Sequence, residues 1–450
     1  MAKFSKISVR AQTRAYISAA ASGSFLSSYL LYAGHDILAF VCVVLSILCY
    51  PFLAFSDRVV FDGKRLTRTG LVWQIWMLAT GQRRKLKPRA LVHVETEALR
   101  AFRRGSNVTY LYRTFLYGDD VSFRFGSGRG YRDMVKAVFP LIPEGCLDVR
   151  SLELRDHFTD ASAALMMAKA LNIPGSDVLD TGAIFSKHER RFLPKVSPGE
   201  DEIKRSDELR SLANQLRANG RLPQALEAFR RALRLTPNNG GLLFEFGRCM
   251  QSLAAARGDD RLDRRSLAML RLAELRSGGD MHLLSRLGET YFSIGAWRRA
   301  EKVFKKAVDS GAKGYRTFRG LGELALRDGK IAHAINYFAQ SAEVAKPSSV
   351  SRWARSETEY LRRLNDDEEY MELELGRINL FDTFDGARRT GLKVFVFGAA
   401  LLIGGLVSGI VLLTEIGWAV AGVALIISLA SAVLKQTFAS RIPFELIDKE

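Results

Sequence analysis

The longest uninterrupted apolar runs of the chain lie near its two ends. Residues 394–413 and 416–434 contain no charged side chain, and at about 1.5 Å per helical residue each run is long enough to cross a hydrocarbon layer. Residues 37–55 form a similar run, and residues 15–33 before it are uncharged but rich in Ser and Ala. Because Ser and Ala favour insertion less than Leu or Val, this last segment is the weakest of the four. The pattern predicts two transmembrane hairpins.

A tight turn is expected in each hairpin, at 34–36 within residues 15–55 and at 414–415 within residues 390–436. Pro51 predicts a kink in the first hairpin, which membrane helices tolerate. A secretory signal peptide is the alternative for the N-terminus, because a basic segment precedes the first apolar run. The segment before residue 34 is a poor cleavage site and a second run follows it, so we favour an uncleaved hairpin. Re-entrant wedges stay an alternative for both hairpins.

Basic residues flank both hairpins, and neither turn contains any. The flanking cations are Lys3, Lys6, Arg10, Arg14, Arg58, Lys64, Arg65, Arg68, Arg388, Arg389, Lys393, Lys435 and Arg441. By the positive-inside rule, this asymmetry predicts an integral membrane protein, as in a bacterial inner membrane, with soluble parts and both termini cytoplasmic. Small residues four apart, at Gly405 and Gly409 and at Gly417 and Ala421, predict close helix packing within the second hairpin. A contact between copies of the chain is the second interpretation.

After the first hairpin the pattern changes to short alternating runs. Apolar residues alternate on both sides of Asp62-Gly63, and residues 108–117 alternate strongly before a turn and residues 121–125. A helical pattern over 131–142 closes the segment. This order of strands and one closing helix resembles the pleckstrin-homology-like domains of bacterial membrane proteins. The resemblance implies a small β domain, residues 56–150, used for binding or assembly.

One loop of this segment combines aromatic and basic residues. Residues 71–78 are apolar and carry Trp73 and Trp76, and a dense run of cations follows them. These cations are Arg83, Arg84, Lys85, Lys87 and Arg89. Interfacial Trp beside bases is typical of a membrane-facing loop, so we expect contact with anionic lipid headgroups. A buried strand followed by a solvated charged run is the alternative.

Residues 151–204 are predicted to be a connector, because Pro and Gly punctuate them. One helix is expected over 156–170, where Phe158 and Leu165 belong to an apolar stripe. Met166 and Met167 are interpreted as core residues of that helix rather than as a binding face.

A 34-residue repeat organises residues 205–347. Small and aromatic residues recur in register, including Ala213, Gly288 and Gly322, then Ala225, Ala300 and Ala334, then Phe229, Phe304 and Phe338. This spacing resembles the tetratricopeptide repeat (TPR) family. The resemblance implies about four helical pairs, with 240–280 degenerate, stacked into a solenoid because no repeat buries its apolar face alone. Residues 348–389 are expected to add a capping helix and a charged bridging helix.

The resemblance also implies a protein-binding groove lined by the first helix of each repeat. Placed on the repeat pattern, its residues in this chain are Arg210, Asn214, Arg217, His282, Arg286, Glu289, Arg316, Arg319 and Arg327. Arg210, Asn214 and Arg286 partly resemble the family's carboxylate clamp for peptide C-termini. Glu245 stands where the clamp has Asn, and His282 where it has Lys. The groove is therefore expected to favour acidic peptides in general, and solvated arginines on helix faces are the alternative.

Composition adds a positive charge and excludes several classes of protein. Lys and Arg number 66 against 48 Asp and Glu, and the net charge of +18 favours anionic partners. With 48% hydrophobic residues, the chain is neither collagenous nor wholly disordered. The four Cys and six His show no CxxC or HExxH spacing, and no phosphate-binding lysine loop occurs. We therefore expect no enzyme activity, metal or cofactor, and no nucleic-acid partner because the charge is spread out.

These patterns predict an α+β membrane protein with two transmembrane helical hairpins, a small β domain and a TPR solenoid, ending in a tail, 437–450. We interpret it as a membrane-anchored TPR scaffold that presents a cytoplasmic protein-binding surface for assembly of a membrane or envelope complex. A membrane-shaping or lipid-binding oligomer with wedge-like hairpins is one alternative. An accessory subunit of a polysaccharide or secretion machine is another.

Overall fold

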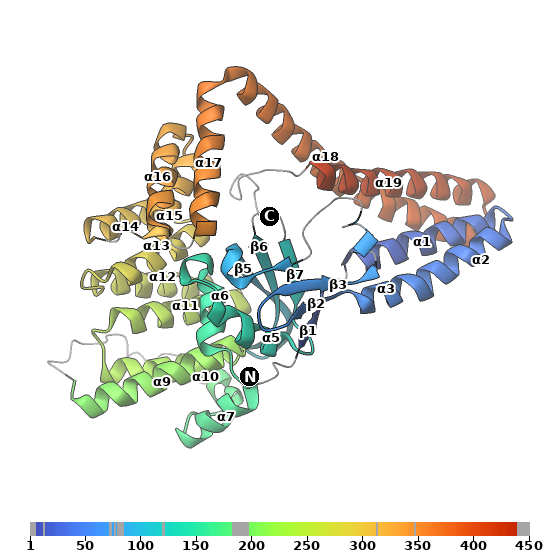
Figure 1. The fold of residues 1–450 in the computed structure, drawn as a ribbon. Helices are drawn as coiled ribbons and strands as arrows, with labels where there is room; N and C mark the ends of the chain where they lie inside the picture. The colour runs from blue at the N-terminus through green and yellow to red at the C-terminus, as the bar shows by residue number, and fades with distance from the viewer. Residues whose placement is uncertain are drawn as a thin grey trace. The chain divides into compact units, whose positions relative to one another are not determined.

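The structure, a computed structural model, describes residues 6–11, 14–71, 74, 75, 78, 85–118, 122–181, 198–311, 314–345 and 348–438. The chain divides into two compact units. The first comprises Met1–Gln12, Ser56–Ala325 and Asn336–Arg355, and the second comprises Thr13–Phe55, Leu326–Ile335 and Ser356–Glu450. The strands and most of the repeat helices belong to the first unit, and the apolar helices belong to the second (Figure 1).

Two antiparallel sheets form the N-terminal part of the first unit. One has the order β1 (Ile7–Arg10), β2 (Arg58–Phe61), β3 (Leu66–Thr69) and β4 (Lys85–Leu86). The other has the order β5 (Leu91–Arg104), β6 (Asn107–Gly118) and β7 (Ser122–Gly126). A bridge between Ala11 and Phe125 joins the sheets, and α5 (Tyr131–Val138) packs on β1. The predicted small sheet region and its closing helix are thus present, while the likeness to pleckstrin-homology-like domains stays a prediction.

Strand β1 comes from the basic segment before the first apolar run, where no strand was expected. It pairs with β2, with Ile7 opposite Phe61 and Arg10 opposite Arg58. Val9 is buried whereas Arg10 is exposed, so one face of this short strand joins the core. The first apolar hairpin is therefore an insertion between two strands that pair with each other.

The helix predicted over 156–170 is in fact two helices, α6 (Val149–His157) and α7 (Ala161–Ala170). The chain leaves helical geometry at Phe158, where φ is −79° and ψ is 88°. The interpretation of Met166 and Met167 as core residues is wrong, because 71% and 47% of their surfaces are exposed. A further short helix, α8 (Ser176–Thr181), follows.

Paired helices build the repeat array. The pairs are α9 (Glu200–Ala218) with α10 (Leu222–Leu235), α11 (Gly240–Arg257) with α12 (Asp260–Leu275), α13 (Met281–Ser293) with α14 (Trp297–Asp309), and α15 (Tyr315–Arg327) with α16 (Ile331–Val344). Close packing explains the small residues of the pattern. A Cβ at Gly288 or Gly320 would lie 2.5 or 2.4 Å from the fully buried ring of Phe304. Helix α17 (Ser348–Asp366) follows the last pair, and its Trp353 ring packs edge-on against Phe338.

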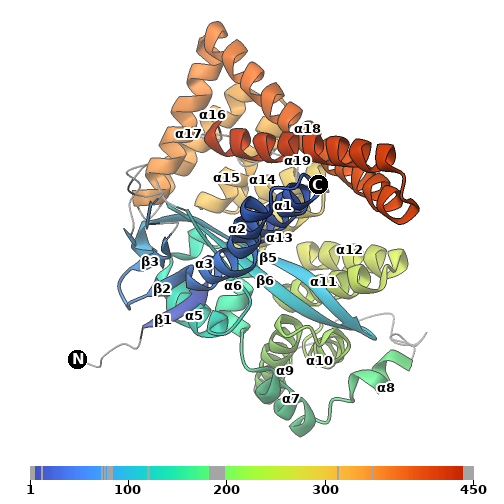
Figure 2. The same cartoon turned by 90° about the vertical axis from the view of Figure 1, so that its right-hand side faces the viewer.

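The long β5–β6 hairpin reaches the repeats, as Figure 2 shows. At its tip, the backbone N–H of Val108 donates to the carbonyl of Gly220, which lies in the turn of the first repeat, at 3.0 Å. Nearby, Arg257 pairs with Asp180 at 2.7 Å and donates to the Ser106 hydroxyl at 2.6 Å. Val108 is buried in the same core as the repeat helices. The sheets and the repeats therefore form one body.

The second unit contains the apolar helices. These are α1 (Arg14–Tyr32), α2 (Asp36–Val44), the π-helical turn η1 (Leu45–Cys49), α3 (Tyr50–Ser56), α18 (Glu368–Ser408) and α19 (Val411–Phe438). Within the described part of the chain, three helical stretches are long and apolar enough to cross a membrane: Asp36–Ser56, Glu368–Ser408 and Val411–Ala432. Helix α1 is not one of them, so only three of the four predicted spans meet this standard.

Local chemistry explains two features of these hairpins. Pro51 has no N–H to donate, and the predicted kink is the π-helical turn just before it, where Tyr50 bonds back to the Leu45 carbonyl. The turn predicted at 414–415 lies instead at Gly409, whose φ of 70° ends α18, so Thr414 and Glu415 are helical. The assignment of Gly409 to helix packing is therefore corrected.

The other three predicted packing residues lie where α18 crosses α19. A Cβ at Gly405 would lie 2.6 Å from the Thr414 nitrogen, and one at Gly417 would lie 2.5 Å from the Leu402 nitrogen. Ala421 is fully buried. Backbones this close require small residues on the facing helix.

Helix α1 packs against the second hairpin through aromatic rings. Phe25 and Tyr29 lie 5.0 and 5.5 Å from Trp418 between ring centroids. On its other side, the buried Ser27 hydroxyl donates to the Ala39 carbonyl at 3.0 Å. Contacts with neighbouring helices on both sides account for the small and polar residues of α1.

Candidate protein-binding groove

The inner face of the repeats is lined by α9, α11, α13 and α15. Each of these helices buries its apolar residues against its partner helix and the next repeat, which leaves polar residues on the inner side. Helix α6 packs against α9 and α13, and also against β5. Figure 1 shows α6 between the strands and the repeat helices. The groove is therefore filled by a helix of the same chain.

One carboxylate of α6 joins the first two repeats. Glu153 pairs with Arg217 of α9 at 3.0 Å and also with Arg248 of α11. The three side chains are only 13%, 7% and 11% exposed. Because buried guanidinium groups are costly without a counter-charge, Glu153 is a strong determinant of how α6 sits in the groove.

The last repeat holds the chain just before α6. Arg316 of α15 donates to the carbonyl oxygens of Glu144 (at 2.7 Å) and Leu147, and it pairs with Glu289 at 3.3 Å. These contacts fix the loop that leads into α6. Because the acceptors on the loop are backbone oxygens, these contacts fix where the loop lies and do not depend on its side chains.

Arg319, one turn along α15, bonds to a residue of the sheet. It pairs with Glu323 at 2.5 Å, and its guanidinium lies 3.2 Å from Nδ1 of His93 on β5. The same group lies over the Trp353 ring, 5.3 Å from its centroid. Arg319 is thus held by three neighbours at once.

The residues that partly resemble a carboxylate clamp bind a carboxylate of their own chain. Arg210 donates two hydrogen bonds to Glu245, at 2.8 and 2.6 Å, and the Asn214 amide donates a third at 2.8 Å. Burial alone would raise the pKa of Glu245, but the bonds and charge of Arg210 outweigh it and hold the pKa below its usual value. Any incoming carboxylate would therefore compete with Glu245.

The remaining predicted groove residues are less engaged. His282 is exposed, and its backbone N–H donates to Asp280 at the start of α13. Arg286 lies over the Phe244 ring at 5.1 Å, and burial lowers its pKa. Arg327 is exposed on α15. The predicted residues thus contact α6, the loop before it, Glu245 or aromatic and sheet residues of the same chain, while His282 and Arg327 are exposed.

Arg248 and the α6 residues that contact the groove were not among the residues predicted from the sequence. Arg248 stands 34 positions after Asn214, so extending the repeat register through the degenerate repeat would have placed it in the groove. Asp148 and Glu153 lie outside the repeats, and no local signal marked them. Asp148 accepts from the Ser151 N–H at 2.8 Å and caps α6, while Thr96 of β5 donates to it at 3.3 Å.

The predicted lipid-contact loop is described only in part. Trp73, Trp76, Arg83 and Arg84 lie outside the described residues. Lys85, Lys87 and Arg89 are exposed. The apolar neighbours Leu71, Ile75 and Leu78 are helical and 53%, 64% and 77% exposed, so these positions do not form a buried strand.

Two cysteines of the first unit are buried thiols. Burial raises the pKa of both Cys146 and Cys249 to about 12. A thiol with such a pKa is a poor nucleophile at neutral pH. Their role is therefore packing in the two hydrophobic cores.

Comparisons with known proteins agree on the repeats. Two family models, both described as tetratricopeptide repeat, match residues 206–239 and 285–350. No curated protein matches the chain in sequence. One of 9 matching chains of solved structures belongs to the "Crystal structure of APC/C hetero-tetramer Cut9-Hcn1", at 12% identity and a TM-score of 0.29. The match covers 66% of this chain and 52% of that one, so the chain spans about half of its neighbour's length.

Proposed function

Because residues 206–239 and 285–350 belong to the tetratricopeptide repeat family, we propose that this chain is a membrane-anchored scaffold for protein partners. The observation that carries the proposal is the groove itself, where Arg217 and Arg248 hold the carboxylate of a helix. A groove that accepts Glu153 suits an acidic helix or peptide from another protein. Such a partner replaces α6, competes with Glu245 for Arg210, or binds along the exposed rim at His282.

The arrangement of strands supports the anchor. β1 and β2 pair with each other and flank the first hairpin, and Ala11 donates to the Asp57 carbonyl at 3.0 Å. Paired strands bring both ends of the inserted hairpin to one place, which favours an even number of crossings or a re-entrant wedge. With basic flanks on both hairpins, we place the soluble unit and both termini on the cytoplasmic side.

Cysteine labelling tests the anchor. In a background with Cys42 and Cys49 replaced by Ser, single cysteines are introduced at the hairpin turns as H35C and I410C, and intact membranes are treated with an impermeant maleimide. Spanning hairpins predict labelling of both cysteines from the face opposite the soluble unit. Labelling only from the soluble side indicates re-entrant wedges, and release of the chain by alkaline carbonate removes the anchor altogether.

A charge-reversal pair tests the groove. R286E reverses the charge of a groove arginine, and K302E reverses the charge of an exposed lysine on α14. The full chain is purified in mild detergent, and the proteins that co-purify in fixed ratio are quantified. We expect R286E to lose a partner that K302E retains. Equal recovery with both variants excludes the groove as the partner site.

Contact with anionic lipid is a second candidate function, because exposed Leu71, Ile75 and Leu78 precede exposed Lys85, Lys87 and Arg89. Anionic lipid is expected to raise the melting temperature of the full chain in detergent more than zwitterionic lipid does. The triple variant K85Q/K87Q/R89Q should lose this difference, whereas K302Q/K305Q/K306Q on α14 should keep it. An equal response of both variants contradicts the proposal.

A further inference from the structure

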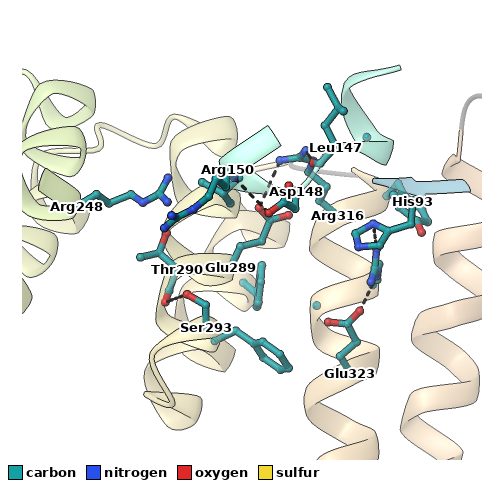
Figure 3. Close-up of a pocket in the computed structure, with 17 residues that line it drawn as sticks. His93, Leu147, Asp148, Arg150, Arg248, Glu289, Thr290, Ser293, Arg316 and Glu323 are labelled. Carbon is teal, nitrogen blue, oxygen red and sulfur yellow. Dashed lines mark hydrogen bonds and ion pairs between the residues drawn. The ribbon is translucent and has the colours of Figure 1, made fainter. Parts of the chain in front are cut away.

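A cavity of about 270 Å³ lies between the groove and the loop that leads into α6. Figure 3 shows side chains entering it from α6, α11, α13 and α15, and from His93 of β5. Its volume is just below the usual range for small-molecule sites, so it suits a compact group rather than a nucleotide. Arg248, which pairs with Glu153, also lines the cavity, so the cavity adjoins that ion pair.

Each carboxylate that lines this cavity already has a partner within the chain. Asp148 caps α6, Glu289 pairs with Arg316 at 3.3 Å, and Glu323 pairs with Arg319 at 2.5 Å. Arg248 has a carboxylate partner in Glu153, but it shares that partner with Arg217. The internal ion pairs therefore leave Arg248 only partly compensated.

Arg150 adds a further positive charge. Its backbone N–H donates to Asp148 at 3.4 Å, while its guanidinium makes no hydrogen bond or ion pair with any residue that the structure describes. Figure 3 shows Arg150 and Arg248 extending toward each other in the cavity. Burial, together with the charges of Arg150 and Arg286, lowers the pKa of Arg248. Two like charges in a poorly solvated cavity favour a bound counter-anion.

We propose that this cavity binds a small soluble compound bearing a phosphate ester or pyrophosphate, held between the guanidinium groups of Arg150 and Arg248. Guanidinium forks match the geometry of phosphate oxygens, and a dianion neutralises both arginines where one carboxylate would neutralise only one. The inference goes beyond the scaffold role and does not depend on it, because the site lies wholly within the first unit.

The test uses the full chain in mild detergent, with pyrophosphate as the probe at constant ionic strength. Calorimetry should detect binding to the wild type, and R150Q should raise the dissociation constant by about tenfold or more, the effect of losing a charged hydrogen bond. R150K retains the charge and should bind between the two. K302Q removes one exposed charge on α14 and should bind like the wild type.

Thermal unfolding without pyrophosphate separates this role from a structural one. R150Q removes the repulsion of Arg248, so it should melt above the wild type when no polyanion is present and gain less when pyrophosphate is added. If R150Q binds pyrophosphate as well as the wild type, or melts below it in the absence of the anion, the proposal is wrong. Absence of pyrophosphate binding to the wild type equally overturns it.

Discussion

The guanidinium of Arg217 lies 3.0 Å from the carboxylate of Glu153, and this ion pair joins the first TPR helix to a helix that follows the small sheets. Both side chains are mostly buried, so the pair is more than a surface contact. It means that the inner groove, the expected partner surface, already carries a ligand from its own chain. Any partner of the groove must therefore compete with α6 or use what α6 leaves open.

Removing the Glu153 carboxylate should destabilise the first unit. E153A leaves the buried charges of Arg217 and Arg248 without their shared partner. Breaking a buried pair in this way should lower the free energy of unfolding by about 3–5 kcal/mol. Urea unfolding of the full chain in mild detergent measures this change. E301A removes one carboxylate from the exposed Lys305 pair and should cost at most about 1 kcal/mol. Similar losses in both variants would show that α6 is not held by this charge.

Gly220 should be far less replaceable than the equivalent turn glycine of the last repeat. Gly220 and Gly329 have φ values of 73° and 71°, so alanine costs about 1–2 kcal/mol of backbone strain at either position. At Gly220 the new Cβ would also lie 1.8 Å from the Val108 carbonyl oxygen, whereas nothing lies within 4 Å at Gly329. G220A is therefore expected to lower stability by roughly a further 1–3 kcal/mol, as overpacking does.

The same urea titration compares G220A with G329A. The difference between the two variants measures the docking of the β5–β6 hairpin on the repeats. Equal losses of unfolding free energy in the two variants would mean that the hairpin tip can move away from residue 220 at no free-energy cost.

Alanine at Gly288 should be tolerated better when the side chain of Phe304 is made smaller. G288A places a Cβ 2.5 Å from the Phe304 ring and should cost about 1–3 kcal/mol. The double variant G288A/F304L is expected to lose less unfolding free energy than the two single variants together, because leucine at position 304 relieves the contact with the new Cβ. G314A is the control, since its Cβ meets only the Thr317 hydroxyl at 3.8 Å. Strict additivity in this cycle would contradict the packing described.

The crossing of α18 and α19 should depend on Gly417 and not on Gly422. A side chain at Gly417 meets the Leu402 backbone at 2.5 Å, but nothing lies within 4 Å of a Cβ at Gly422. G417V should therefore separate the helices, and G422V should not. Cysteines at Thr390 and Val423, which line one apolar cavity, report the separation through disulfide cross-linking in membranes. A cross-link that forms equally well in both variants rules out this crossing.

Local patterns predicted most of the helices. Apolar runs without charges identified α2, α18 and α19, and the 34-residue spacing of Gly, Ala and Phe located the repeats, because each signal lies within a few helical turns. The apolar runs did not predict the turn of the second hairpin correctly, because the turn lies at Gly409, whose φ is positive, and not at 414–415. Local patterns also failed at β1, since a strand of four residues carries too little alternation to be recognised by itself.

The candidate site depended on contacts that no local pattern records. The repeat register identified Arg217, Arg316 and their neighbours as inner-face residues, because helical periodicity decides which side chains share a face. That Glu153 and the Leu147 carbonyl would meet them was decided by tertiary packing alone. Burying these arginines requires a counter-charge, and any acidic residue that the fold brings near can supply it. The sequence therefore determined the groove and its charge, and the tertiary structure decided what fills it.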